Sequence, residues 1–196
     1  MGKNLSLTNA MSNKYEPKRQ NRWVISILPP TAAGETFAGG AEELAFAAHT
    51  ANRPDITFDQ TEMHRQNERF YVAGKPTWGE ITMEFYDFVN GENSASRVLW
   101  NWATAIYNPV TGSMGYKADY STTATLSLLD PIGDVAETWS LFYIWPTSVN
   151  WNELSSESSE IVNVSVTFRY DYALMGVSED LASEKYNGSA TEAAEE

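Results

Sequence analysis

The chain of 196 residues carries a formal net charge of −13 and contains no cysteine. These features exclude disulfides, thiol catalysis and cysteine-ligated metals, and they argue against nucleic-acid binding, which needs Lys and Arg to displace the counterions of phosphates. Hydrophobic residues make up 42% of the chain, which suffices for one domain with a core. No apolar run approaches the roughly 20 residues that span a membrane, and the N-terminus lacks the apolar region of a secretory signal.

Charge is distributed unevenly along the chain. Residues 1–20 are polar and mostly basic, and they are expected to form an arm whose natural partner is the acidic surface of a neighbouring copy. Residues 175–196 are acidic and are expected to form a flexible, solvated tail, which leaves residues 21–174 as the folded domain. The acidity of this domain suits a surface past which DNA moves without sticking, or serves solubility alone.

Residues 22–28 are predicted to form the first strand, because this β-rich run is followed by two prolines. Residues 31–43 are predicted to be a loop, and short strands are expected at 44–50, 55–59 and 69–73. His64 lies in the polar run before the last of these strands and is expected on an exposed loop.

Residues 78–88 alternate with the period of two that marks a strand with one dry face. The side chains predicted to face the core are Ile81, Met83 and Phe85, and those on the polar face are Glu80, Thr82 and Glu84.

A single convincing helix is predicted at about residues 94–107, with Asn93 or Ser94 as its N-cap. Its apolar stripe consists of Ala95, Val98, Leu99, Trp102 and Ile106. Trp100 and Trp102 fit a ligand-stacking site, but a helix that docks its aromatic side chains on a sheet is the favoured interpretation.

Two further strands at residues 120–129 and 138–145 are predicted to form a hairpin, because the Asp-Pro-Ile-Gly-Asp sequence between them is typical of a turn. The last strand is predicted at 161–172 and alternates throughout. Its core side chains are Val162, Val164, Val166 and Phe168, and its polar face includes Asn163, Ser165 and Thr167. The predicted fold is therefore mainly β, with two packed antiparallel sheets in a sandwich or barrel and one flanking α-helix.

No group of residues predicts catalysis, a metal site or a cofactor. His49 and His64 lie on separate segments without ligand spacing, and there is no cysteine to complete a zinc site. Glu80 and Glu84 would stand about 13 Å apart along a strand, too far for a glycosidase pair. The chain is not expected to be an enzyme.

From about residue 72 to residue 172 the sequence resembles the tail tube proteins of contractile-tailed bacteriophages. The similarity is carried by VAGKPTWGEITMEFYD at 72–87, VLWNW at 98–102, IWPTSVNWNEL at 144–154 and SSEIVNVSVTFRYDYA at 158–173. The long arm, the 31–43 loop and the tail exceed what this family leads one to expect.

The resemblance implies a structural subunit of the virion tail, synthesised and assembled in the host cytoplasm. Hexameric rings would stack head to tail into a hollow conduit for DNA ejection, with a fold related to that of type VI secretion tube proteins. The implied partners are further copies of the chain, the sheath, the baseplate and terminator proteins, the tape measure protein and transiting DNA, with no membrane. By the same analogy, the polar faces at Glu80, Thr82 and Glu84 and at Asn163, Ser165 and Thr167 are expected to line the lumen.

Other functions remain open from sequence alone. A baseplate or terminator ring, or the tube of an extracellular injection particle, fits the same fold. Trp78, Trp139, Trp145 and Trp151 also suggest a small-ligand or carbohydrate-binding β module, although packing is the commoner use of such residues.

Overall fold

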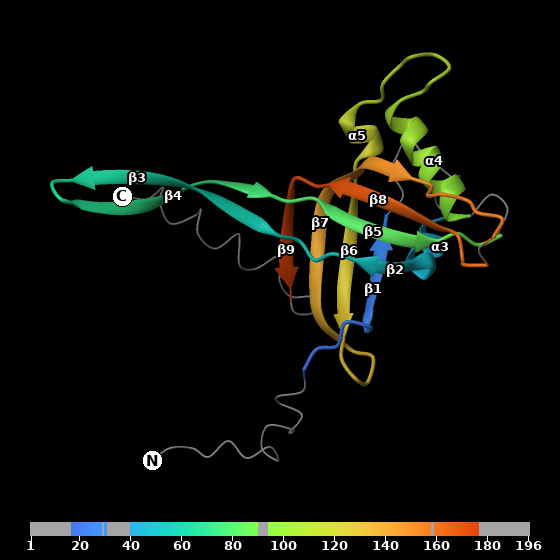
Figure 1. Ribbon diagram of the computed structural model, residues 1–196, viewed down its shortest axis with the longest axis horizontal. Coiled ribbons are helices and arrows are strands. Elements are labelled where there is room, and N and C mark those ends of the chain that lie inside the picture. Colours follow the sequence, from blue (N-terminus) through green and yellow to red (C-terminus); the bar gives the residue numbers. More distant parts are fainter. Residues whose placement is uncertain (1–16, 29, 31–39, 90–93, 158, 177–196) are drawn as a thin grey trace, which may run out of the picture.

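The computed structural model describes residues 17–28, 30, 40–89, 94–157 and 159–176. Two antiparallel sheets share one long strand, helices lie beside them, and a long hairpin projects from the body (Figure 1). The predicted mainly β fold with two antiparallel sheets is confirmed. The sheets do not close into a barrel.

The first sheet has the strand order β1-β6-β7-β9. It comprises β1 (Trp23–Ile27), β6 (Thr122–Leu129), the first part of β7 (Val135–Asn150) and β9 (Tyr172–Gly176). The expected first strand and the expected hairpin between the two central strands are confirmed.

The second sheet has the order β7-β8-β5-β2. It comprises the second part of β7, β8 (Asn163–Arg169), β5 (Ile81–Tyr86) and β2 (Ala48–Ala51). Strand β7 passes from one sheet to the other near Tyr143, whose φ of 58° lies in the left-handed region. The strand expected at 138–145 is therefore too short, because the chain bends at this residue and continues in the second sheet.

The turn between β6 and β7 is organised by one carboxylate. Oδ1 of Asp130 accepts hydrogen bonds from the backbone N–H groups of Ile132, Gly133 and Asp134, each at 2.9 Å. Gly133 has a φ of 100°, a conformation that favours glycine.

Replacing Asp130 by alanine is expected to lower the free energy of unfolding by about 1–2 kcal/mol, because three backbone donors lose their acceptor. Urea unfolding of the unassembled chain measures the loss. Asp134→Ala is the matched control, since no side-chain hydrogen bond of Asp134 occurs among the described residues. An equal loss in both variants would contradict this role of Asp130.

The core lies between the sheets and beneath helix α4 (Ala95–Ile106). Ser94 is the N-cap, and its hydroxyl accepts a hydrogen bond from the Arg97 N–H at 3.4 Å, as expected for a helix of these bounds. The short helix α5 (Lys117–Tyr120) follows. The buried side chains of α4, β5 and β8 are Ala95, Val98, Leu99, Trp102, Ile81, Met83, Phe85, Val164, Val166 and Phe168.

A second helix, α3 (Gly40–Ala47), occupies most of the segment expected to be the strand 44–50. That prediction is wrong up to Ala47, and β2 supplies the strand only from Ala48 onward. Alanine and glutamate favour a helix here, and the buried Leu44 and Ala47 share a face. Gly40 packs so closely on α4 that a Cβ atom would lie 2.2 Å from Cγ2 of Val98. Residues 31–39 of the expected loop lie outside the described residues.

The projecting hairpin joins β3 (Ile56–Arg65) to β4 (Glu68–Trp78). The short strands expected at 55–59 and 69–73 are parts of this hairpin, and His64 lies on a strand instead of in a loop. The side chains of the hairpin are almost all exposed, as the polar sequence predicts. Because neither face is buried, the sequence has no alternating pattern from which strands of this length could be predicted.

The strand expected at 161–172 is broken in two. Strand β8 ends at Arg169, Tyr170 is buried against Trp78, and β9 begins at Tyr172 and pairs with the other sheet. Val162 is 41% exposed, which corrects its assignment to the core, because it precedes the first residue of β8. The expected boundary between domain and tail at residues 174 and 175 falls inside β9, and residues 177–196 lie outside the described residues.

Candidate functional site

The candidate site is the polar face of the second sheet. Thr82 lies opposite Thr167 and Glu84 opposite Ser165, so the polar positions of β5 and β8 form one continuous surface. Asn163 lies on the same face, opposite Tyr86. All of these side chains are half-buried in the single chain. The structure thus brings together the polar residues that the alternation selected.

This face points away from the core. The other face of β5 and β8 is covered by the first sheet and by α4, where the Trp102 ring lies 5.5 Å from that of Phe168. The polar face extends onto β7, where Ser148 lies opposite Thr167 and Asn150 opposite Ser165. Sequence reasoning missed this extension because the predicted strand ended at residue 145.

Each glutamate near this face has a basic neighbour. The Glu84 carboxylate lies 3.3 Å from Nε2 of His49, whose ring also stacks on Tyr86 at 4.2 Å. Glu80 precedes β5 and lies 3.9 Å from the Arg169 guanidinium. The face is therefore polar, and each of its two glutamates has a partner side chain. Sequence reasoning missed His49 because nothing in its local pattern places it on β2 beside Glu84.

In the part of the chain that the structure describes, the sheets end in edges that have no partner strand. Within the described residues, β1 and β9 border the first sheet, while β2 and the second part of β7 border the second. Such edges present unpaired N–H and C=O groups that pair readily with another chain. The single chain is therefore suited to side-by-side association.

Residues 18–175 match the family model described as phage tail tube protein. The chain belongs to this family. Its members are structural tube proteins, which agrees with the predicted resemblance and with a non-catalytic role. Among curated proteins, the sequence has no significant match.

Solved structures with the tail tube fold resemble the chain at low sequence identity. The cap that terminates the tube of the anti-feeding prophage is 18% identical, with a TM-score of 0.61 over 83% of this chain and 92% of that one. A chain of the sheath–tube complex of the extracellular contractile injection system PVC is 17% identical, with a TM-score of 0.60 over 88% and 98%. A chain of the anti-feeding prophage baseplate is 14% identical, with a TM-score of 0.61 over 83% and 97%. These similarities establish the shared fold.

Nothing in the described part of this tail tube protein forms a metal site: no three His, Asp or Glu side chains gather there. None of the helices in that part has the length and apolarity needed to cross a bilayer.

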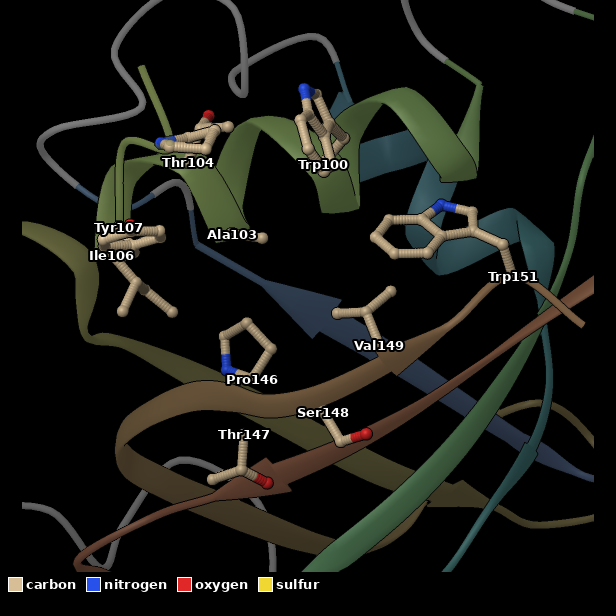
Figure 2. Close-up of a pocket in the computed structure, with 11 residues that line it drawn as sticks. Trp100, Ala103, Thr104, Ile106, Tyr107, Pro146, Thr147, Ser148, Val149 and Trp151 are labelled. Atoms are coloured by element: carbon tan, nitrogen blue, oxygen red, sulfur yellow. The ribbon is translucent and has the colours of Figure 1, made fainter. Parts of the chain in front are cut away.

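The tryptophans considered for ligand binding do not converge. Trp78 packs on Tyr170, Trp139 donates a hydrogen bond to Glu137, and Trp145 contacts Tyr120. Only Trp151 lines a groove, of about 320 Å³, between α4 and β7, where its ring lies 5.9 Å from that of Trp100 (Figure 2). Trp102 is buried in the core, so the proposed pairing of Trp100 with Trp102 does not occur.

Glu137 is the one charged side chain that is buried in the described residues, with 3% of its surface exposed. Lys18 donates a hydrogen bond to its carboxylate, Nε1 of Trp139 lies 2.5 Å from Oε1, and the Arg53 guanidinium lies 3.9 Å away. The Lys18 hydrogen bond holds the pKa of Glu137 below its usual value despite the opposing effect of burial. Lys18 was expected to contact a neighbouring copy, but its partner here is in its own chain.

A lowered pKa makes the contribution of Glu137 to stability pH-dependent. The contribution is complete above the usual pKa of 4.5, and it is lost as the pH falls through the lower pKa of the folded state. We expect the free energy of unfolding of the native chain to exceed that of Glu137→Gln at pH 7, and the difference to shrink as the pH falls below 4.5. Urea unfolding across this range measures it, and a difference that does not vary with pH would contradict the ion pair.

Proposed function

We propose that this tail tube protein forms hexameric rings that stack head to tail into a hollow conduit inside a contractile sheath. The observation that carries the proposal is the pair of open sheets whose edge strands lack partners among the described residues, in a chain of the tube family. A ring of subunits pairs the edges that a lone domain leaves exposed. Repeated head-to-tail contacts between rings extend the assembly without limit.

In this tube, the polar face of β5 and β8 forms the inner wall. Glu80, Thr82 and Glu84 from one segment and Asn163, Ser165 and Thr167 from the other present polar side chains on this face. The net charge of −13 adds a repulsion that keeps phosphates from adhering. These properties suit the passage of DNA during ejection into the host.

The proposed partners are those of a contractile tail. Further copies of the chain bind at the sheet edges, the sheath surrounds the tube, and baseplate and terminator proteins close its ends. The tape measure protein and then DNA occupy the lumen. Support comes from structures of the same fold that occur in a sheath–tube complex, a terminating cap and a baseplate.

Negative-stain electron microscopy of the purified protein tests the proposal. Long hollow filaments are the expected result. A ring that stops at six or twelve chains would indicate a terminator or baseplate component instead, and a monomer at high concentration would overturn the proposal.

Cysteine labelling of filaments tests the inner wall, since the native chain has no cysteine. Ser165→Cys is expected to react with a bulky maleimide in the unassembled chain and to be protected in filaments. Met114→Cys is the control, because Met114 is 73% exposed in the loop after α4, and α4 lies on the other side of this sheet. Equal labelling of both positions in filaments would contradict the assignment.

The conduit of an extracellular injection particle is the second candidate, favoured by the similarity to a chain from the extracellular contractile injection system PVC. The subunit and its assembly are then the same.

A further inference from the structure

A basic groove lies between the edge strands of the two sheets. It has a volume of about 830 Å³, and all four residues of β2 line one wall while Trp23 of β1 lines another. Leu126 and Leu128 of β6 form its apolar floor. The groove is thus the opening of the two-sheet core on the side of β1 and β2.

The charge of this groove is opposite to that of the chain. Lys18, Arg19 and Arg53 line it together with His49, and no Asp or Glu does so among the described residues. Glu137 is buried beneath the groove and balances only part of this positive charge. In a chain of net charge −13, a groove of this kind selects an acidic, partly apolar ligand.

The chain itself supplies such a segment. Gly176, at the end of β9, pairs with Thr138, the neighbour of the Glu137 that contacts Lys18 and Arg53. From this point the chain continues with residues 177–196, which contain one lysine and the acidic residues Glu179, Asp180, Glu184, Glu192, Glu195 and Glu196. Apolar residues such as Leu181 lie between them. The seven residues from 177 to 183 span at most about 24 Å, which exceeds the roughly 14 Å between β9 and β1 across β7 and β6.

We propose that the acidic segment 177–196 binds the basic groove between β1 and β2 of its own chain. Its carboxylates contact Arg19 and Arg53, and its apolar side chains cover Leu126 and Leu128. The bound segment shields β2, a free edge of the second sheet, in a subunit that has no neighbour. The inference stands apart from tube formation, because it concerns the unassembled chain.

Bismaleimide cross-linking of double-cysteine variants tests this binding, and the cysteine-free native chain leaves no background. Ser183→Cys is combined with Asn52→Cys or, separately, with Gln20→Cys, two groove positions with exposed side chains. The control partner is Val110→Cys, which is 92% exposed in the loop between α4 and α5, at the end of the molecule opposite to the end of β9 (Figure 1). Dilute protein keeps the chains unassembled, and circular dichroism verifies that each variant is folded.

The expected result is an intramolecular cross-link at both groove positions, with a yield at least about fivefold above the control, because binding raises the local concentration of the segment. Two changes are each expected to reduce the yield to that of the control. The first is the double substitution Arg19→Gln and Arg53→Gln, which removes the positive charges. The second is about 1 M NaCl, at which the Debye length is about 3 Å and charges are screened. Lys18 is kept, so that the buried Glu137 retains its partner. Equal yields at groove and control positions, yields insensitive to salt and to the arginine substitutions, or cross-links that join two chains would each overturn the proposal.

Discussion

Replacing Trp102 by alanine is expected to lower the free energy of unfolding by about 3–5 kcal/mol, the usual cost of removing a large aromatic side chain from a core. The ring has no exposed surface, and it packs against Phe168 on β8. Its Nε1–H donates a hydrogen bond of 2.7 Å to the carbonyl of Tyr120, the last residue of α5. The substitution therefore leaves a cavity between α4 and the second sheet and an acceptor without its donor. Urea unfolding of the dilute, unassembled chain measures the effect.

Trp100→Ala is the matched control on the same helix. Trp100 is 49% exposed, and its ring lies 5.9 Å from that of Trp151 across the groove that both residues line. We expect this variant to lose less than about 1 kcal/mol, because a half-exposed ring gives up little buried apolar area. Equal losses in the two variants would contradict the position of α4 on the sheet.

The sequence predicts those elements whose side-chain period is determined by a single buried face. Strand β5 buries every second residue from Ile81 to Phe85, and α4 buries Val98, Leu99 and Trp102 at helical spacing. The turn at Asp130 was also predictable, because its geometry is local. In each of these cases the pattern within one segment contains the information that decides the structure.

Elements that depend on distant segments were not predictable in this way. Helix α3 has eight residues, too few for a sustained helical period, and the close packing of Gly40 on Val98 of α4 involves a distant segment. The hairpin β3–β4 buries almost nothing, so it has no dry face to produce an alternation. The bend of β7 at Tyr143 and the break between β8 and β9 depend on which sheet each segment joins.

Only part of the candidate site could be predicted from local side-chain patterns. Alternation identified Thr82, Glu84, Ser165 and Thr167 as one polar face, and pairing of β5 with β8 places them together. The position of His49 beside Glu84 depends on β2 joining this sheet, which the sequence pattern does not reveal. Whether the face lines a lumen depends on neighbouring copies, and it stays a proposal.

Replacing both Met63 and Phe70 by serine is expected to weaken filament formation while leaving the domain folded. These residues face each other across the β3–β4 hairpin, are 47% and 45% exposed, and lie on the same side as the 47% exposed Val72. Strand β3 pairs only with β4 among the described residues, so this apolar surface has no partner within that part of the chain. Exposed apolar patches of this kind mark contacts with other proteins, and in the proposed tube the partner is a second copy. We expect the concentration needed for assembly to rise at least about tenfold, equivalent to about 1.4 kcal/mol per contact.

Sedimentation and negative-stain electron microscopy measure the assembly, and urea unfolding of the dilute chain verifies the fold. Arg69→Ala is the matched control on the opposite side of the hairpin, where the Arg69 guanidinium lies 3.4 Å from Glu62. An exposed ion pair of this kind contributes little to stability, so filaments are expected to form as in the native protein. If the double variant assembles normally, the apolar side of the hairpin is not a subunit contact, although the edge strands remain available for ring formation. If both variants fail to assemble, the contact depends on the hairpin as a whole instead of on its apolar side.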